Sequence, residues 1–195
     1  MTRLATRAEL PRVALVLAHA FERDPVLSAL LPADETVVDR LRRYFELEAE
    51  QALLRGGEVW VDDDVQAAAV WRPPGAWVDS TLRQLGRIPG YLSVFGRRFG
   101  AASRLATALG RVHPEAPHWY LPFVGVEPAA AGRGLGTAVL EPVLDRCDRE
   151  RHAAYLEATS AACARLFARL GFEPREQVEV LPGATVTPMW RPPRQ

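Results

Sequence analysis

Three glycines at alternate positions, Gly132, Gly134 and Gly136, form the most distinctive chemical motif of the sequence. A strand-like apolar run precedes them over residues 119–124, and a helix-like apolar pattern follows over residues 138–144. Because glycine has no Cβ, such a loop lets the backbone approach a ligand closely. Its free N–H groups stand at the start of a helix, where the dipole favours an anion. The motif predicts a bound phosphate group, although a tight turn without a ligand explains a lone loop of this kind equally well.

Two common phosphate-binding motifs do not fit this loop. It is not a G-x-G-x-x-G fingerprint, because Val139 occupies the position of the third glycine. It is not a Walker loop either, because all 24 basic residues of the chain are arginine and none is lysine. The lack of lysine also excludes a Lys nucleophile and a Schiff base.

Length and composition narrow the class of protein. The chain has 195 residues, of which 48% are apolar and 25% charged, so we expect a single domain over residues 1–195 with a sizeable core. A formal net charge of zero gives no indication of a nucleic-acid or membrane partner. No apolar run is long enough to span a bilayer.

Metal, disulfide and secretion signals are weak. Cys147 and Cys163 form no spaced cluster, and the four histidines show no His-x-x-x-His pattern, so we predict no metal site and a reducing cytoplasm. The acidic triplet at residues 62–64 is interpreted as a solvated turn rather than a metal site. Basic residues before the apolar run 13–17 resemble a secretory signal, but the run is short and is expected to be the first helix.

Periodicity along the chain predicts a mixed sheet with helices on both faces. We expect a break at Pro89–Gly90 within the helical stretch, and a kink at Pro142. The expected helices cover residues 9–23, 26–31, 36–54, 78–112, 134–151 and 163–170, and the expected strands cover residues 3–6, 58–61, 65–71, 118–126, 153–158, 172–180 and 184–189.

A longer pattern around the glycines carries a family resemblance. Residues 124–136 read Val-Gly-Val-x-Pro-x-x-x-Gly-x-Gly-x-Gly, followed downstream by Leu-Glu-Ala-Thr-Ser at 156–160 and Arg-Leu-Gly-Phe at 169–172. Together they closely resemble the acetyl-CoA loop and later elements of the GNAT superfamily of N-acetyltransferases, and most closely its puromycin N-acetyltransferase-like group. The resemblance implies an α/β (α+β) fold with a splayed sheet of about six to seven strands. A helical insertion at about 78–112 would precede the cofactor-binding strand.

The same resemblance implies how acetyl-CoA, the cosubstrate, would bind. Its pyrophosphate would lie on the N–H groups of the loop, and its pantetheine arm would run along the strand before the loop like an added strand. The residues implied to bind it are Val124, Gly125, Val126, Ala131, Gly132, Arg133, Gly134, Leu135, Gly136, Thr137, Cys163 and Phe167.

The implied reaction is direct attack of a small molecule's primary amine on the thioester. Glu157 matches the family's strand glutamate and is expected to act as the base or through a water, although a structural carboxylate paired with arginine fits equally. Phe167 stands where the family has its acidic tyrosine, so Tyr155 and Tyr120 are candidate substitutes. The residues expected to line the acceptor pocket are Asp24, Glu48, Trp71 and Tyr120.

Two further interpretations stay open at this point. Phe167, Ala131 and Cys163 depart from the family pattern and would also suit a non-catalytic acyl-CoA-binding sensor or partner domain. The apolar middle of the chain could support a homodimer.

Overall fold

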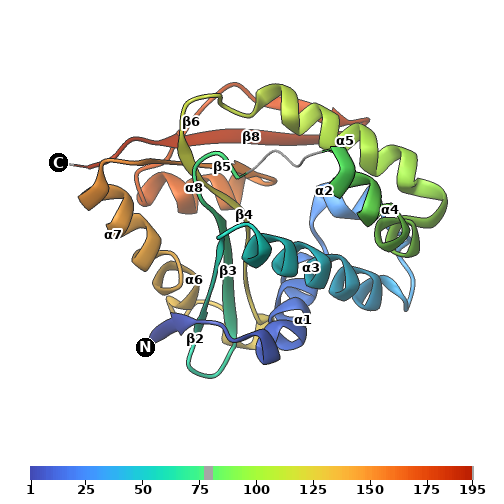
Figure 1. Cartoon of the computed structure of the whole chain (residues 1–195), viewed down its shortest axis with the longest axis horizontal. Helices are drawn as coiled ribbons and strands as arrows, with labels where there is room; N and C mark the ends of the chain where they lie inside the picture. The colour runs from blue at the N-terminus through green and yellow to red at the C-terminus, as the bar shows by residue number, and fades with distance from the viewer. Residues whose placement is uncertain (77–80, 195) are drawn as a thin grey trace.

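A mixed central sheet organises the computed structural model, which describes residues 1–76 and 81–194 (Figure 1). Within these residues eight strands run in the order β1-β2-β3-β4-β5-β8-β6, and β7 pairs with β8. Neighbouring strands are antiparallel, except that β4 and β5 are parallel. The predicted α/β class is therefore confirmed. The strands are β1 Thr2–Leu4, β2 Glu58–Asp62, β3 Ala67–Arg72, β4 His118–Val126, β5 Ala153–Ala158, β6 Glu173–Pro174, β7 Val178–Leu181 and β8 Ala184–Arg191.

Helices cover both faces of this sheet, and each face has its own hydrophobic cluster (Figure 1). Successive side chains of β3 alternate between the two clusters, as the pleat requires. Helices α1 to α5 pack over one face, and α6 to α8 over the other. The helices are α1 Leu10–Phe21, α2 Pro25–Ser28, α3 Val37–Leu54, α4 Thr81–Phe95, α5 Phe99–Val112, α6 Leu135–Ala138, α7 Glu141–Glu150 and α8 Ala161–Arg169, with short 3₁₀ turns η1 Arg7–Glu9, η2 Gly96–Arg98 and η3 Pro128–Ala130.

Local signals in the sequence explain where the first helices start. Pro11 lies in the first turn of α1, where a missing N–H leaves no carbonyl unpaired. The apolar face of α1 is fully buried in the core, so the segment that resembles a secretory signal forms a structural helix, as expected. Asp24 caps α2, because its Oδ1 accepts hydrogen bonds from the N–H groups of Val26 at 3.0 Å and Leu27 at 2.9 Å.

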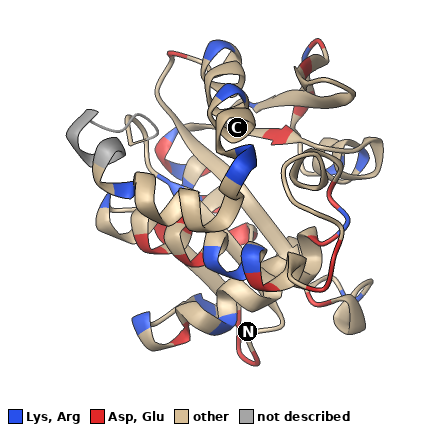
Figure 2. Cartoon of the chain, turned by 90° about the vertical axis from the view of Figure 1, so that its right-hand side faces the viewer, with Lys and Arg blue, Asp and Glu red and all other residues tan. Residues whose placement is uncertain are grey.

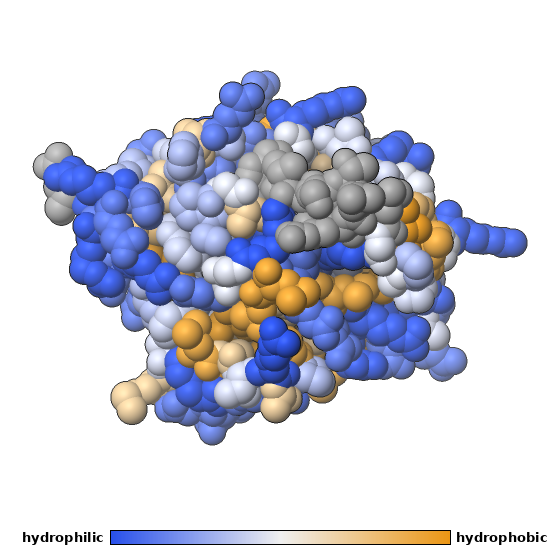
Figure 3. Space-filling model, viewed as in Figure 1, coloured by the Kyte–Doolittle hydropathy of each residue, from blue (hydrophilic) through white to orange (hydrophobic). Residues whose placement is uncertain are grey.

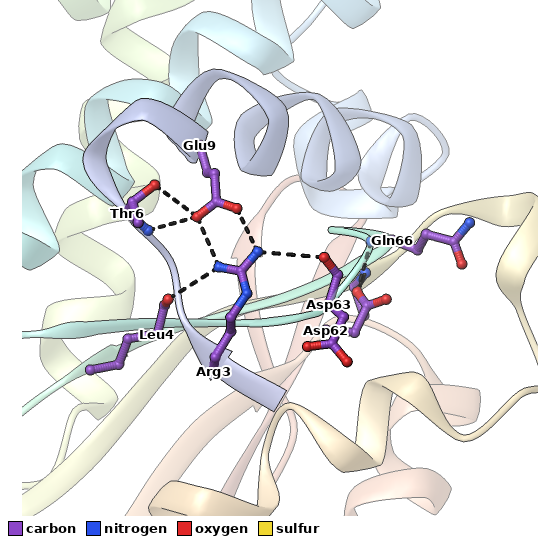
Figure 4. A network of polar contacts seen from close by, with 8 residues as sticks. Arg3, Leu4, Thr6, Glu9, Asp62, Asp63 and Gln66 are labelled. Atoms are coloured by element: carbon purple, nitrogen blue, oxygen red, sulfur yellow. Dashed lines mark hydrogen bonds and ion pairs between the residues drawn. The ribbon is translucent and has the colours of Figure 1, made fainter. Parts of the chain in front are cut away.

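The start of the chain is held against the β2–β3 turn by a polar network (Figure 4). Arg3 donates to both carboxylate oxygens of Glu9, which in turn accepts from the backbone N–H of Thr6 at 2.8 Å. Asp62 Oδ1 accepts from the N–H groups of Gln66 and Ala67 at 2.7 and 2.6 Å. The acidic triplet is therefore part of a hairpin turn, as predicted.

The helical stretch between β3 and β4 differs from the expectation. Helix α4 continues through Pro89 and ends only at Phe95, before Gly96 adopts a positive φ of 50°. Pro89 is exposed and has no N–H to donate, yet the helix continues past it. The predicted break at Pro89–Gly90 is therefore wrong, and the predicted start at residue 78 lies outside the described residues.

Two predicted elements are each divided in the structure. The helix expected over residues 134–151 is two helices, because Leu140 N–H bonds to the Thr137 carbonyl and ends α6, while Pro142 lies in the first turn of α7. The strand expected over residues 172–180 is also two, β6 and β7, interrupted after Pro174, which has no N–H for a ladder. The sheet therefore has eight strands within the described residues, rather than six or seven.

Charged and apolar side chains are distributed differently over the surface. Figure 2 shows basic and acidic residues interspersed along the helices. Figure 3 shows an apolar band across one face of the molecule. No second copy of the chain is seen against the described residues of this band, and the homodimer stays a prediction. None of the helices in the described parts of the chain is long and apolar enough to cross a membrane. Both cysteines are free thiols, and the cytoplasmic location likewise stays a prediction.

Candidate active site

The two central parallel strands separate after a short paired segment. Residues 118–120 of β4 pair with residues 153–155 of β5, and the pairing ends there. In contrast, β4 stays paired with β3 as far as Val126. The splayed sheet expected from the sequence is therefore confirmed, and the second half of β4 has an edge that β5 does not cover.

A β-bulge in β4 accompanies this separation. Val70 faces Phe123, but Arg72 faces Tyr120, so β4 has one more residue than β3 between these pairs. Pro122 lies in the bulged stretch and cannot donate to a ladder. Because a bulge bends its strand and increases the local twist, it explains why β4 turns away from β5 at this point.

The open edge of β4 presents the backbone of Val124 and Val126. Glu127 N–H donates to the Gln66 carbonyl at 2.7 Å, which fixes this opposite pair as hydrogen-bonded. In an antiparallel ladder the hydrogen-bonded pairs alternate, so Gly125 also faces β3. The N–H and C=O groups of Val124 and Val126 consequently point to the gap. An extended ligand can pair with them as an added strand.

The glycines after β4 serve two different purposes. Gly132 and Gly134 have positive φ angles of 77° and 78°, and an added Cβ at either would meet nothing within 4 Å. Gly136 allows close packing, because a Cβ there would lie 3.2 Å from Val126 Cγ2. The first helical bond of α6 runs from Ala138 N–H to the Gly134 carbonyl. The preceding N–H groups of this turn are therefore available to an external acceptor.

A cavity of about 670 Å³ lies beside this loop and the open strand edge. Six of the residues predicted to bind the cofactor line it, and the other six, all from the stretch 131–137, are absent from its wall. The predicted residues on the wall are Val124, Gly125, Val126, Gly136, Cys163 and Phe167. The remaining predicted residues are Ala131, Gly132, Arg133, Gly134, Leu135 and Thr137. Of these, Arg133 donates to Gln66 Oε1 at 3.0 Å.

The end of α1 forms a part of the cavity wall that sequence analysis did not identify, through His19, Ala20, Glu22 and Arg23. Helix α1 reaches the cavity because it packs directly on β4: a Cβ at Gly125 would lie only 2.7 Å from Ala20 Cβ. His19 Nδ1 is 2.8 Å from Glu127 Oε2, which links the helix end to the residue after β4. In the sequence, Gly125 of the glycine motif was the one residue that indicated a close approach of another segment to β4.

These features fit the CoA part of acetyl-CoA. A free strand edge with alternate N–H and C=O groups matches the amides of a pantetheine arm, and the open turn after it offers N–H groups to a pyrophosphate. The cavity joins the two, and its wall is mainly apolar along α8, where Leu166 and Phe167 contribute.

Glu157 lies on β5, two residues beyond the last residue that pairs with β4. Its side chain is 7% exposed, and its Oε2 accepts a hydrogen bond from Tyr120 Oη at 2.9 Å. Burial, reinforced by the Glu157 carboxylate, raises the pKa of Tyr120 well above its ordinary value. Tyr120 is thus a neutral hydrogen-bond donor that orients the carboxylate at the mouth of the strand gap.

Tyr155 is on the same face of β5 as Glu157 but is completely buried. Its hydroxyl lies 3.4 Å from the Val112 carbonyl, and it does not line the cavity. Burial, with a smaller contribution from Glu157, raises its pKa above the ordinary value. The structure therefore places Tyr155 beside the candidate base and away from the predicted cofactor cavity.

Glu48 belongs to a separate buried network that ends on Tyr120. Its carboxylate accepts from Arg72 at 2.6 Å and Arg87 at 3.3 Å, and also from the Tyr91 hydroxyl. The Arg72 guanidinium lies 5.9 Å from the centre of the Tyr120 ring. Glu48 is therefore paired with arginines, and it reaches Tyr120 through Arg72 rather than by presenting a free carboxylate.

Three other candidates occupy structural positions. Asp24 caps α2, and its Oδ2 also accepts from Thr159 Oγ1 at 2.5 Å, which ties α2 to the end of β5. Trp71 has no exposed surface and lies in the cluster under α6 and α7. Phe167 lines the cavity and packs edge-on against Phe172, so its position carries no acidic proton. The structure does not bring Trp71 to the Glu157 group.

Comparison with known proteins agrees with this geometry. The acetyltransferase (GNAT) family matches residues 37–172. A solved structure from Corynebacterium glutamicum, described as histone acetyltransferase HPA2 and related acetyltransferase, is 31% identical, with a TM-score of 0.77 and coverage of 100% of this chain and 97% of that one. This chain therefore belongs to the GNAT acetyltransferase family, and it is an acyltransferase that uses acetyl-CoA.

More distant solved structures share the fold. The polyamine N-acetyltransferase of Drosophila melanogaster is 18% identical, with a TM-score of 0.65 and coverage of 97% of this chain and 98% of that one. The yncA protein of Salmonella typhimurium, solved with acetyl-CoA, is 20% identical, with a TM-score of 0.55 and coverage of 100% and 94%.

Proposed function

We propose that the chain transfers an acetyl group from acetyl-CoA directly to the primary amine of a small molecule, as in the puromycin N-acetyltransferase-like group. The observation that carries the proposal is the position of Glu157: a buried carboxylate, oriented by Tyr120, just beyond the point where β4 and β5 separate. A buried carboxylate there attracts an ammonium group and can take its proton.

The binding residues follow from the free edge and the open turn. Val124 and Val126 would hydrogen-bond the pantetheine arm, and the N–H groups of residues 132–137 would hold the pyrophosphate. Bound acetyl-CoA supplies the thioester carbonyl that the amine attacks. Cys163 and Phe167 would form the wall beside it, as the cavity lining supports.

Proton transfer is the part of the reaction that the chain's own residues must supply. An amine attacks only when it is neutral, so Glu157 would remove the ammonium proton, directly or through one water. Phe167 cannot protonate the departing sulfur, but a thiol pKa of about 8.5 makes the thiolate a fair leaving group near neutral pH. Cys163 on the cavity wall and solvent remain the proton sources.

A thiol-release assay with acetyl-CoA and a panel of primary amines tests the proposal. We expect Glu157→Gln to lower kcat by about 10²- to 10⁴-fold, the usual range for loss of a general base, with unchanged acetyl-CoA affinity by calorimetry. The matched control is Glu173→Gln, which changes an exposed residue of β6 and should leave both quantities unchanged. If Glu157→Gln retained full kcat, Glu157 would not be the base.

The alternative is a non-catalytic acyl-CoA-binding domain, which Phe167 on the cavity wall favours. In that case the chain binds acetyl-CoA but releases no thiol with any amine. Phe167→Tyr then discriminates between the two functions, because activity that appears only in this variant would show that the parent lacks its acid.

A further inference from the structure

A histidine at the end of helix α1 lines the cofactor cavity and has no role in the reaction described above. The side chain of His19 is 34% exposed, and its Nδ1 atom is 2.8 Å from Glu127 Oε2. Because an ionised carboxylate only accepts hydrogen bonds, this Nδ1 carries a proton. The second ring nitrogen, Nε2, makes no hydrogen bond with any described residue. It is therefore available to a ligand in the cavity.

The carboxylate of Glu127 is held by two side chains of α1. Its Oε1 atom forms an ion pair with Arg12 at 3.3 Å, its Oε2 atom faces His19, and the side chain is only 14% exposed. An uncompensated carboxylate here would repel an anion bound at the glycine turn. Arg12 compensates that charge, so a protonated His19 leaves the group of three with a net positive charge.

The position of Glu127 in the chain places His19 at the glycine-turn end of the cavity. Glu127 directly follows Val126, against which Gly136 of the turn packs, and Val126 and Gly136 share the cavity wall with His19. The reactive end, marked by Glu157, lies where β4 and β5 separate. His19 therefore faces the region that suits the phosphates of the cofactor rather than its thioester.

Other charged groups near His19 leave this positive charge in place. Glu22 and Arg23 also line the cavity and are exposed, but their charges are opposite. Strand β3 and helix α3, which pack on α1, contribute no charged contact to His19 from their described residues. An imidazole changes its charge near neutral pH, whereas arginine and glutamate side chains ordinarily keep theirs.

We propose that His19 binds a phosphate group of acetyl-CoA, an inference that rests on the cofactor placement in the proposed function. The doubly protonated ring donates from Nδ1 to Glu127 and from Nε2 to a phosphate oxygen. Glu127 is a positioning residue, because its hydrogen bond fixes the orientation of the ring. Both partners of the charged ring are anionic, so a neutral ring takes up one proton from solvent at Nε2 when the cofactor binds.

Two substitutions at position 19 separate the charge from the rest of the side chain. His19→Asn keeps an N–H for Glu127 but has no donor in place of Nε2. We expect it to raise the Kd for CoA about 10-fold at about pH 6, and less as pH rises, because the wild-type ring then loses its proton. His19→Arg keeps a permanent charge and donors for both partners, so its affinity should match that of the wild type at about pH 6 and should not fall as pH rises.

A matched control removes a histidine elsewhere on the molecule. His152 also lies beside a glutamate, with its Nδ1 atom 3.6 Å from Glu150 Oε2, but it does not line the cavity. His152→Asn should therefore leave the Kd for CoA unchanged at each pH. Thermal unfolding of the three variants verifies that each is folded before its affinity is compared.

Calorimetry with CoA, dephospho-CoA and pantetheine locates the contact. If His19→Asn weakens CoA and dephospho-CoA alike, the partner is the pyrophosphate, and if it weakens CoA alone, the partner is the 3′-phosphate. Both results support the proposal. An equal loss for pantetheine, which has no phosphate, would overturn it.

Proton uptake gives a second measurement that a purely structural role of His19 would not change. In buffers of different ionisation enthalpy, the wild type should take up more protons on binding CoA than His19→Arg does, and equal uptake would also count against the phosphate contact. A wild type that binds CoA but acetylates no amine would instead overturn the proposed transfer, while the affinities and the proton uptake still decide the role of His19.

Discussion

The contact between α1 and β4 makes Gly125→Ala the sharpest test of how the cavity is built. A Cβ at this position would lie 2.7 Å from Ala20 Cβ and 3.1 Å from Leu17 Cδ2. The first distance is well inside van der Waals contact and involves an atom fixed to the helix backbone. Helix α1 must therefore move away from the sheet.

The cost of this movement can be bounded. Adding a methyl group to a packed core destabilises a protein by about 1–3 kcal/mol. In a chain of this size that range lowers Tm by about 2 to 12 °C. Because the end of α1 also forms the cavity wall through His19 and Arg23, the same variant should weaken acetyl-CoA binding.

Thermal unfolding and calorimetry measure the two effects, and two controls isolate their cause. Gly86→Ala adds the same methyl group to helix α4, where it meets nothing within 4 Å, and should raise stability by up to about 1 kcal/mol. Ala20→Gly removes the atom that Gly125→Ala meets, so the double variant should be less destabilised than the sum of its parts. An unchanged Tm for Gly125→Ala would refute the close packing of α1 on β4. Strict additivity of the Gly125→Ala and Ala20→Gly stability changes would refute it as well.

Two further predictions concern ion pairs. Glu48→Ala leaves the buried Arg72 uncompensated and should cost about 3–5 kcal/mol in urea unfolding, whereas Glu46→Ala, in a half-exposed pair with Arg42, should cost less than about 1 kcal/mol. Equal costs would contradict the burial of the Glu48 network. Hydrogen bonding to its partners lowers the pKa of Glu9 to about 2 from 4.5. Because the folded-state pKa is lowered, the ionised Glu9 stabilises the fold fully above about pH 4.5, and this stabilisation is lost as pH falls to about 2. The stability difference between wild type and Glu9→Gln should therefore shrink as pH falls from about 4.5 to about 2. A constant difference would contradict this assignment.

Local patterns predicted most of the elements. The long helix α3, the hairpin around Asp62 and the glycine turn depend on periodicity and turn residues within a few positions of each other. Two of the wrong predictions concern prolines whose effect on the helix depends on the surrounding tertiary structure. Pro89 stays inside α4 because its face is exposed, whereas Pro142 begins α7 instead of kinking a continuous helix.

Contacts across long separations were beyond the reach of the sequence. Tyr120 meets Glu157 across 37 positions, and Arg72 meets Glu48 across 24, because strand register and helix packing bring them together. No local pattern indicated that His19 of α1 would meet Glu127 just after β4.

The chain by itself determined the chemistry of the glycine turn, since glycine permits positive φ wherever it is placed, and it determined the family pattern around that turn. Only the tertiary structure decided what surrounds the turn. The bulge at Pro122 separates β4 from β5 and leaves Val124 and Val126 with an open backbone edge. Packing at Gly125 then brings α1 to the cavity. These outcomes depend on register and side-chain volume between distant segments, which spacing along one chain does not specify.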